Sequence, residues 1–258
     1  MKNLKRLVIA LTAILLPLLA ACNGGAPNPT VKKISDVDGK TIGVVAGSSA
    51  EIFAAGVGEV RVYASEAGMA AEVRSGAIDC AVTDGYAVNS AAKSAHGLKT
   101  IAEPLFKLDL AIIAAKQAKD LTADVNSALR TLRDSGVLPA IIGNYTRGEP
   151  YAYRPRTDIP EDAGTLHLAV GGAFAEYMKI DERGNFSGLD IDVARAVCDL
   201  LGVKLEISGV APAELVNAVW TGKADFAMGA MYETPERAEL VDFSSPYVTC
   251  ELKVITRK

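Results

Sequence analysis

The sequence predicts an α/β protein of two similar lobes, each a mostly parallel sheet flanked by helices. Three observations favour this class. Short apolar runs alternate with helical segments of about ten residues, which is typical of βαβ units. A proline-rich stretch without apolar periodicity, 147–164, divides the chain. The segment 73–82 recurs at 219–228 with the same spacing of Val, Gly, Asp and Ala, so two related halves explain the chain better than one domain.

In the first block, helix caps and apolar runs define the elements. Gly76 ends one helix because glycine readily adopts the left-handed conformation of a helix C-terminus, and Thr122 is the expected N-cap of another. The expected elements are strand 41–45, strand 60–63, helix 66–74, strand 80–83, a helix from about residue 86, strand 110–115, helix 122–133 and a short helix to residue 145.

The second block repeats the alternation. Apolar side chains recur at helical spacing over 190–201, and Gly202 ends that helix. The other expected elements are strand 166–170, strand 204–207, helix 213–221, strand 225–228 and strand 251–256. In sheets of this kind ligands bind beyond the carboxyl ends of the strands.

The N-terminus has the pattern of an export signal. Basic residues precede Leu7–Ala21, an uncharged stretch that is shorter than the roughly 20 residues of a membrane span. Its last residues, Leu-Ala-Ala-Cys22, resemble the lipobox of bacterial lipoproteins, although a plain signal peptide with a nearby cysteine is the alternative. We therefore expect a signal at 1–21, a lipidated Cys22 and a lipid tether at 22–35, which places the protein outside the cytoplasm.

Charge and composition exclude several functions. The net charge is −4 and no basic run is present, so nucleic acid is not an expected partner. Two distant histidines without cysteines at ligand spacing argue against a metal site, and no cofactor is expected. Cys80, Cys198 and Cys250 lie in apolar settings and are expected as small buried side chains, although one pair could be oxidised.

Residues that follow the strands are the candidates for binding. Ser48 and Ser49 come directly after strand 41–45 and suit an oxyanion, or Ser48 is simply a helix cap. The loop lacks the lysine of a nucleotide phosphate loop, which favours a carboxylate. Asp84 follows strand 80–83, and either caps a helix or holds a cation. Arg237 lies one turn into a helix that begins Thr-Pro-Glu. An Arg, an anion site and an Asp together fit a zwitterionic amino acid.

Four stretches carry a family resemblance. Two read GNFSGLDIDVARAVCDLLGV (184–203) and MYETPERAELVDFSSPY (231–247), and two read DVDGKTIGVVAGSSAE (36–51) and ALRTLRDSGVLPAIIGNY (128–145). The first two resemble the opening half of family 3 solute-binding proteins, the polar amino-acid receptors of ABC importers. The other two resemble the closing half. The resemblance implies a two-lobed, type II periplasmic-binding-protein-like fold.

The halves stand in the reverse of the family order, which indicates a circular permutation. On this interpretation 36–107 form the family's second lobe, and 108–258 form its first lobe from 108–147 and 165–258, joined by the linker 148–164. We expect one covalent crossing between lobes, near 106–109, and hence a loose hinge or domain swapping. A fragment of a tandem protein is the alternative.

The resemblance also implies a ligand site. It puts the ligand carboxylate on Arg237, the Ser48 N–H and the Ser49 hydroxyl, the ligand ammonium on Asp84, and an aromatic contact on Phe174. The family's Ser-Ser-x-Ser stretch is replaced here by 229–232. We therefore expect the carbonyls of Gly229 and Ala230 to accept from the ammonium and Tyr232 to fill space.

Three functions follow from the resemblance. The first is a lipid-anchored, extracytoplasmic receptor that binds an amino acid or similar small carboxylate and delivers it to ABC permease subunits; it is not an enzyme. The second is an enzyme like cyclohexadienyl dehydratase, for which Glu176 and Glu233 are the cleft-edge candidates for acid–base chemistry. The third is a ligand-sensing lipoprotein without transport.

Overall fold

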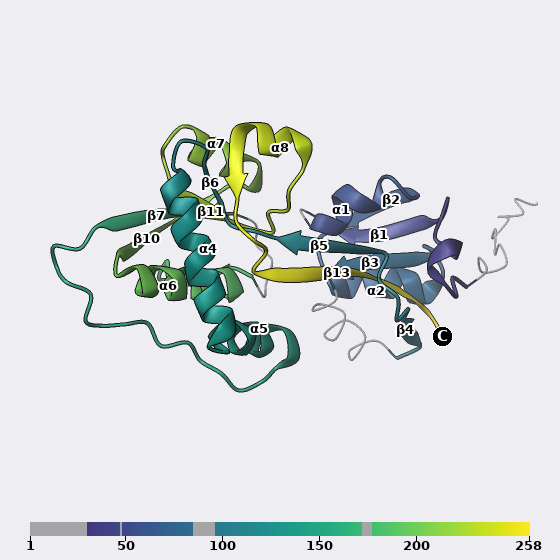
Figure 1. The fold of residues 1–258 in the computed structure, drawn as a ribbon. Coiled ribbons are helices and arrows are strands. Elements are labelled where there is room, and N and C mark those ends of the chain that lie inside the picture. Colours follow the sequence, from purple (N-terminus) through teal and green to yellow (C-terminus); the bar gives the residue numbers. More distant parts are fainter. Residues whose placement is uncertain (1–29, 47, 85–95, 172–176) are drawn as a thin grey trace, which may run out of the picture.

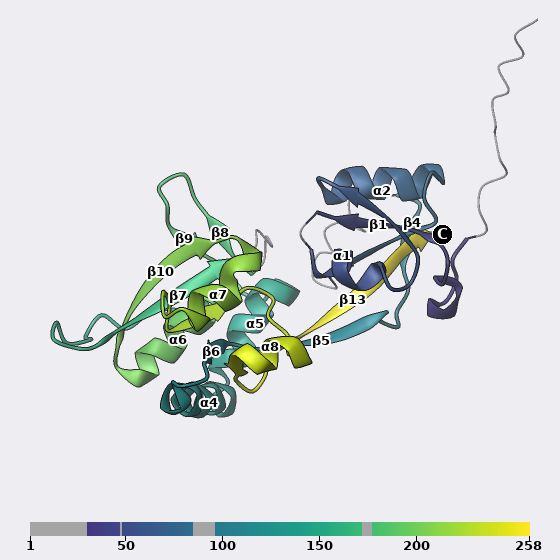
Figure 2. The same cartoon turned by 90° about the horizontal axis from the view of Figure 1, so that it is seen from above.

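Two sheets organise the computed structural model, which describes residues 30–46, 48–84, 96–171 and 177–258 (Figure 1). The expected leader 1–21, Cys22, most of the tether 22–35 and the helix expected from residue 86 lie outside the described residues, as do Phe174 and Glu176. Seen from above, the two lobes stand apart and two extended strands run between them (Figure 2). Each lobe is a sheet with helices packed on it, as expected.

The first sheet has the strand order β2-β1-β3-β13-β4, with β5 also paired to β13. Its strands are β1 (Thr41–Val45), β2 (Glu59–Tyr63), β3 (Cys80–Asp84), β4 (Leu98–Thr100), β5 (Phe106–Leu110) and β13 (Val248–Arg257). The helices that the structure describes in this lobe are the 3-10 turn η1 (Ile34–Asp36), α1 (Ser49–Ala54) and α2 (Glu66–Ser75).

The second sheet has the order β10-β7-β11-β6-β12, and a two-stranded β8-β9 ribbon accompanies it. Its strands are β6 (Ile113–Ala115), β7 (Thr165–Gly171), β10 (Lys204–Val210), β11 (Phe226–Met228) and β12 (Val241–Phe243), and the ribbon is β8 (Lys179–Ile180) with β9 (Phe186–Ser187). The helices are α4 (Lys119–Asp134), α5 (Val137–Arg147), α6 (Leu189–Leu201), η2 (Pro212–Glu214), α7 (Leu215–Trp220) and α8 (Pro235–Leu240).

Both sheets are mixed rather than mostly parallel. In the first, β1 pairs in parallel with β2 and β3, whereas β13 is antiparallel to β3, β4 and β5. In the second, β7 is parallel to β10 and β11, and β6 is antiparallel to β11 and β12. The βαβ units predicted from the sequence form the parallel parts. The antiparallel strands are those next to the crossings between lobes, which enter each sheet from the opposite direction.

The two lobes are joined by two crossings, so the expectation of one was wrong. The predicted strand 110–115 is two strands, because β5 ends at Leu110 in the first sheet and β6 begins at Ile113 in the second. The second crossing runs from β12 to β13. Backbone bonds hold the crossings together: Tyr247 N–H donates to Leu110 O at 2.9 Å, and Ser244 N–H donates to Ile112 O at 2.9 Å. The hinge is therefore two paired strands.

Strand β13 also corrects the boundary expected for the lobe 108–258. Its residues pair with β3 in the register Leu252↔Asp84 to Ile255↔Ala81, so the C-terminal residues complete the sheet of the first block. Alternate burial along this strand is compatible with either sheet, and the pairing partner alone decides between them. A further difference is local: α4 begins at Lys119, one turn before the cap expected at Thr122.

The proline-rich linker is docked on the second lobe. The Tyr153 hydroxyl donates to Asp199 Oδ2 at 2.6 Å, and the Arg156 N–H donates to the same oxygen at 2.9 Å. Asp199 lies in the last turn of α6 and is buried. The linker therefore closes over the end of this helix. Cys80, Cys198 and Cys250 are buried and unpaired, as the default interpretation predicted.

Asp190, in the first turn of α6, is a fully buried carboxyl group at the hinge. Its Oδ1 accepts a hydrogen bond from the Tyr247 hydroxyl at 2.6 Å, and its Oδ2 has no partner in the described part of the chain. Burial removes solvent from the charged form and raises the pKa of Asp190 from 3.8 to about 7. Tyr247 lies at the end of the second crossing, directly before β13, so this group is packed against the connection between the lobes.

We predict that Asp190 lowers stability as the pH rises towards neutrality. Between about pH 4 and about pH 7 the folded protein keeps a proton that the unfolded chain releases, so the free energy of unfolding falls with pH and levels off above the folded pKa. Asp190→Asn lacks this titration and still offers an oxygen to Tyr247. Its melting temperature relative to the unchanged protein should therefore rise from about pH 5 to about pH 8. A difference that stays constant over this range would contradict the prediction.

Candidate ligand-binding site

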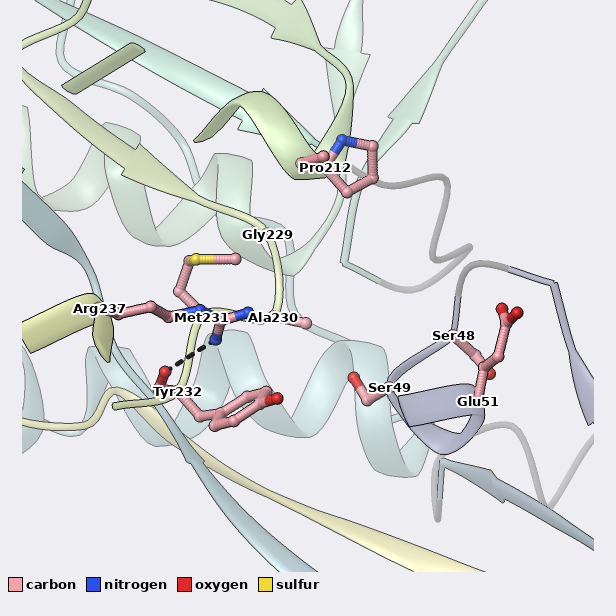
Figure 3. A pocket seen from close by; sticks show the side chains of 10 residues that line it. Ser48, Ser49, Glu51, Pro212, Gly229, Ala230, Met231, Tyr232 and Arg237 are labelled. Carbon is pink, nitrogen blue, oxygen red and sulfur yellow. Dashed lines mark hydrogen bonds between the residues drawn. The ribbon is translucent and has the colours of Figure 1, made fainter. Parts of the chain in front are cut away.

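A cavity of about 330 Å³ lies between the lobes and gathers six of the predicted site residues (Figure 3). The first lobe contributes three residues from the start of α1, and the second contributes the loop after β11, the segment around Pro212, and α8. The lining residues are Ser48, Ser49, Glu51, Pro212, Ala213, Gly229, Ala230, Met231, Tyr232 and Arg237. The structure thus brings together residues almost 190 positions apart in the sequence. This agrees with the expectation that ligands bind beyond the carboxyl ends of strands in an α/β fold.

The serines stand where β1 passes into α1. Ser48 has the extended backbone of a helix N-cap, but its side chain makes no capping bond. Its hydroxyl oxygen is buried and has no hydrogen-bond partner among the described residues, so the simple capping alternative does not account for it. The Ser48 N–H, expected to hold a ligand, instead donates to Val45 O at 3.1 Å. The side chain, rather than this N–H, is the group left for a ligand.

Arg237 is held firmly at the opposite wall. The Thr234 hydroxyl caps α8 by accepting from the Arg237 N–H at 3.3 Å, with Pro235 at the first helical position as predicted. The guanidinium donates from Nη1 to Tyr232 O at 3.0 Å, and its Cζ lies 4.6 Å from the centroid of the Tyr232 ring. Backbone and ring together therefore fix a cation on the cavity wall.

The loop after β11 has an unusual backbone. Gly229 has φ +145°, and a Cβ at this position would lie 2.4 Å from Gly171 O. Ala230 follows with φ +51°, a left-handed conformation that costs an L-residue about 1–2 kcal/mol. Strained backbone of this kind gathers at functional sites. The predicted carbonyl contacts of Gly229 and Ala230 with an ammonium remain a prediction.

Asp84 lies at the hinge and connects the lobes. Its Oδ2 accepts from the Tyr177 hydroxyl at 2.9 Å and from Cys250 Sγ at 3.0 Å. Burial is the main cause that raises the pKa of the Cys250 thiol, and the nearby Asp84 carboxylate raises it further. The thiol is therefore protonated and acts as the donor. Asp84 is not one of the described residues that line the 330 Å³ cavity. Its expected role towards an ammonium stays a prediction, as does that of Phe174.

Sequence reasoning missed Glu51 and Phe53. Glu51 stands three residues after Ser48, a spacing that places both on one side of a helical turn, and this signal could have identified it. Phe53 contacts the Tyr232 ring of the other lobe with the ring centroids 5.1 Å apart, which local sequence could not reveal. Glu233, a candidate for acid–base chemistry, lines a neighbouring cavity with Lys107 and Asp109.

Nowhere in the described ranges do three or more His, Cys, Asp or Glu side chains gather as metal ligands would. No helix among these residues combines the length and the apolar character needed to cross a bilayer.

With a two-lobed fold and a cavity between its lobes, the molecule has the architecture of a periplasmic binding protein. Over 85% of its length the chain resembles a phosphate-binding protein of a phosphate ABC transporter from Streptococcus pneumoniae TIGR4, with a TM-score of 0.50, 14% identity and 90% of that chain covered. At this identity the likeness shows the fold alone. It confirms the fold class, while the permuted order of the halves stays a prediction.

Residues 166–258 match the family model of the bacterial extracellular solute-binding proteins, family 3. Over 83 residues (32% of the chain) it is 31% identical to the octopine-binding periplasmic protein of Rhizobium meliloti, covering 28% of that protein. Over 99 residues (38% of the chain) it is 29% identical to the arginine-binding extracellular protein ArtP of Bacillus subtilis, covering 38% of it. The matches thus span about a third of the length of these relatives.

An enzyme is also among the relatives. The chain is 28% identical over 97 residues, or 38% of its length, to the cyclohexadienyl dehydratase of Pseudomonas aeruginosa, of which 36% is covered. The family match therefore includes both binding proteins and an enzyme.

The Gly229–Ala230 pair makes two different predictions about stability. Gly229→Ala drives a methyl group into a backbone carbonyl and should lower the free energy of unfolding by about 2–3 kcal/mol. Ala230→Gly removes the backbone strain of a left-handed alanine from the folded state. It also raises the conformational entropy of the unfolded chain, which costs about 0.4–1 kcal/mol, so the net change in the free energy of unfolding should be close to zero. Urea unfolding of both variants checks this, and equal losses would show that the loop backbone is not as described.

Proposed function

We propose that this protein binds an amino acid or a similar small carboxylate in the cavity between its lobes. The observation that carries this proposal is the arrangement of Arg237 opposite Ser48. Arg237 on one lobe lies across a cavity of about 330 Å³ from Ser48 and Ser49 on the other, and the buried Ser48 hydroxyl has no partner among the described residues. Buried polar groups are rarely left without partners, so this one indicates a place for a polar ligand group.

The chemistry of the walls supports a ligand of amino-acid size. Arginine presents a planar fork that matches a carboxylate with two parallel hydrogen bonds. The volume lies near the lower end of the roughly 300–1,000 Å³ of small-molecule pockets, which suits a single small molecule. Glu51 also lines this cavity, and a carboxyl group on its wall is consistent with a ligand that also carries an ammonium. The names of the octopine-binding and arginine-binding relatives are consistent with such ligands.

The division of the site between lobes supports binding coupled to closure. Ser48 and Ser49 move with the first lobe, and Arg237 moves with the second. A ligand that contacts both walls is bound most tightly when the lobes are together, and therefore shifts the population towards the closed state. The two paired crossings are the hinge about which such a movement would take place.

The experiment that tests this function begins with a thermal-shift screen of amino acids and small dicarboxylates, because tight binding raises the melting temperature. Calorimetry with the best ligand then compares Arg237→Ala with the unchanged protein. Loss of the charged, bidentate contact should weaken binding by about 10- to 100-fold. Arg130→Ala, which removes an exposed arginine of α4, is the matched control and should bind normally.

Ser48→Ala and Asp84→Asn refine this test. Ser48→Ala should weaken binding by about three- to tenfold, since one hydroxyl contact is lost. If Asp84 holds the ammonium, Asp84→Asn should weaken the binding of ligands that carry an ammonium more than the binding of their des-amino analogues. A near-normal affinity of Arg237→Ala would overturn the site assignment.

The remaining steps of the proposed function concern the membrane. We propose that Cys22 is lipidated, that the protein stays on the extracytoplasmic face, and that it delivers its ligand to ABC permease subunits. The support is the export-signal pattern of residues 1–22 together with the extracellular family matched by 166–258. A ligand-sensing role without transport uses the same site and differs only in its partner.

Lipid anchoring makes a direct prediction. Cys22→Ser removes the thiol that would carry the lipid, and should move the protein from the membrane fraction to the soluble extracytoplasmic fraction with its ligand affinity unchanged. Fractionation and immunodetection measure this. Retention of Cys22→Ser on membranes would contradict the anchor.

An enzyme on this scaffold is the second candidate, favoured by the match to cyclohexadienyl dehydratase. Its candidate acid Glu233 lines the cavity next to the one that contains Arg237. Incubation of the purified protein with a cyclohexadienyl acid, followed by ultraviolet absorption of an aromatic product, would decide for the enzyme if turnover is seen.

A further inference from the structure

We propose that Tyr232 is the positioning residue of this site, and that it makes the orientation of Arg237 depend on closure of the lobes. The inference rests on the proposed function, because it assumes that Arg237 holds a carboxylate. It goes further by naming the contacts that couple ligand affinity to closure of the lobes, which are those among the stacked side chains of Phe53, Tyr232 and Arg237. Tyr232 itself lines the cavity.

Tyr232 holds Arg237 in two ways. Its carbonyl accepts one guanidinium N–H at 3.0 Å, and its ring lies 4.6 Å from Arg237 Cζ. In Figure 3 the ring lies beneath the guanidinium, whose remaining N–H groups extend over it towards the cavity. A planar cation on an aromatic face gains about 0.5–2 kcal/mol, so the ring favours one orientation of the fork over others.

The same ring is supported by the other lobe. The Phe53 ring, on α1, lies 5.1 Å from the Tyr232 ring centroid at an interplanar angle of 53°. Phe53 in turn lies 5.1 Å from Phe106, at the start of the strand that leads into the first crossing. Edge and tilted contacts of this kind are worth about 0.5–1.5 kcal/mol beyond the area they bury. Tyr232 is therefore where the second lobe touches an aromatic pair of the first.

The backbone of Tyr232 is tied to the hinge as well. It forms an isolated antiparallel bridge with Leu110, and the neighbouring Met231 O accepts from the Ala111 N–H at 2.7 Å. Leu110 and Ala111 belong to the first crossing. Because its backbone is attached to the hinge and its ring to the opposite lobe, Tyr232 responds to the angle between the lobes.

A consequence follows for ligand binding. When the lobes separate, Phe53 leaves the Tyr232 ring, which becomes free to change rotamer, and the guanidinium loses the surface that orients it. In this structure the ring is held between Phe53 and Arg237. Figure 3 shows the Tyr232 hydroxyl pointing towards Ser49 of the other lobe, so the hydroxyl lies at the edge of the cavity rather than under the guanidinium.

The experiment uses the full chain and the amino acid with the highest affinity in the thermal-shift screen. Calorimetry compares Tyr232→Phe, Tyr232→Leu, Phe53→Leu and the double variant, with Arg130→Ala, which changes an exposed residue of α4 outside the cavity, as the control. Tyr232→Leu should lose about tenfold in affinity, and Tyr232→Phe should stay within about threefold because the ring is kept. Phe53→Leu should also lose affinity, by about threefold.

The double variant separates positioning from general damage. If Phe53 acts through the Tyr232 ring, the double variant should bind no more weakly than Tyr232→Leu alone. Small-angle scattering without ligand should show a larger radius of gyration for both Tyr232→Leu and Phe53→Leu. Melting curves establish that each variant is folded, and Phe53→Leu still tests the proposal if Tyr232→Leu is not.

The outcomes distinguish failure of the positioning role of Tyr232 from failure of the proposed function. Losses that multiply in the double variant, or an affinity of Tyr232→Leu within about twofold of normal, overturn the positioning role. Failure of the unchanged protein to bind any carboxylate overturns the proposed function instead. In that case the ligand-free scattering still tests the contact between lobes, and unchanged radii for both variants overturn it.

Discussion

The rest of the structure depends on the pairing of β13 inside the first sheet. This strand lies between β3 and β4 and also pairs with β5, yet it is the last strand of the chain. The first lobe therefore cannot complete its sheet until the chain has left it, built the second lobe and returned. Such long-range pairing makes the first lobe dependent on the rest of the chain, since its sheet is completed only by β13, whereas all strands of the second sheet lie within the contiguous stretch 113–243. It also fixes two crossings side by side, which limits how the lobes move relative to one another.

The site follows from this arrangement. Because the crossings set the lobes against each other, the loop after β1 and the loop after β11 face one another and enclose the cavity. Neither lobe contains all the proposed binding groups, since the hydroxyls come from one and the guanidinium from the other. The aromatic contact between Phe53 and Tyr232 crosses the same gap. The charged groups, the hydrogen bonds and the geometry of the hinge are thus coupled, and a change in one is expected to alter the others.

The linker and the hinge show how polar groups are satisfied away from the cavity. Asp199 accepts from the Tyr153 hydroxyl and the Arg156 N–H, so the linker 148–164 is bound to α6 rather than left as a free connection. Asp84 accepts from Tyr177 and Cys250, which places a charged group where the lobes meet. Asp190 is different, because one of its oxygens is buried without a partner in the described part of the chain. A carboxyl group in that setting prefers its proton, which is why its pKa lies near neutrality.

The sequence by itself determined the local elements and the residues at their ends. Apolar periodicity and caps located most strands and helices, because these signals arise from contacts between near neighbours. The position of Ser48, Ser49 and Arg237 after strand ends predicted that they meet in one site, and the family resemblance added Gly229, Ala230 and Tyr232 to it. Only the tertiary structure decided which sheet receives β13, that the stretch 110–115 is a crossing, that the Ser48 N–H is used by its own turn, and that Phe53 supports Tyr232. These features depend on which distant strand or ring comes alongside, and a pattern within one segment carries no information about its partner in space.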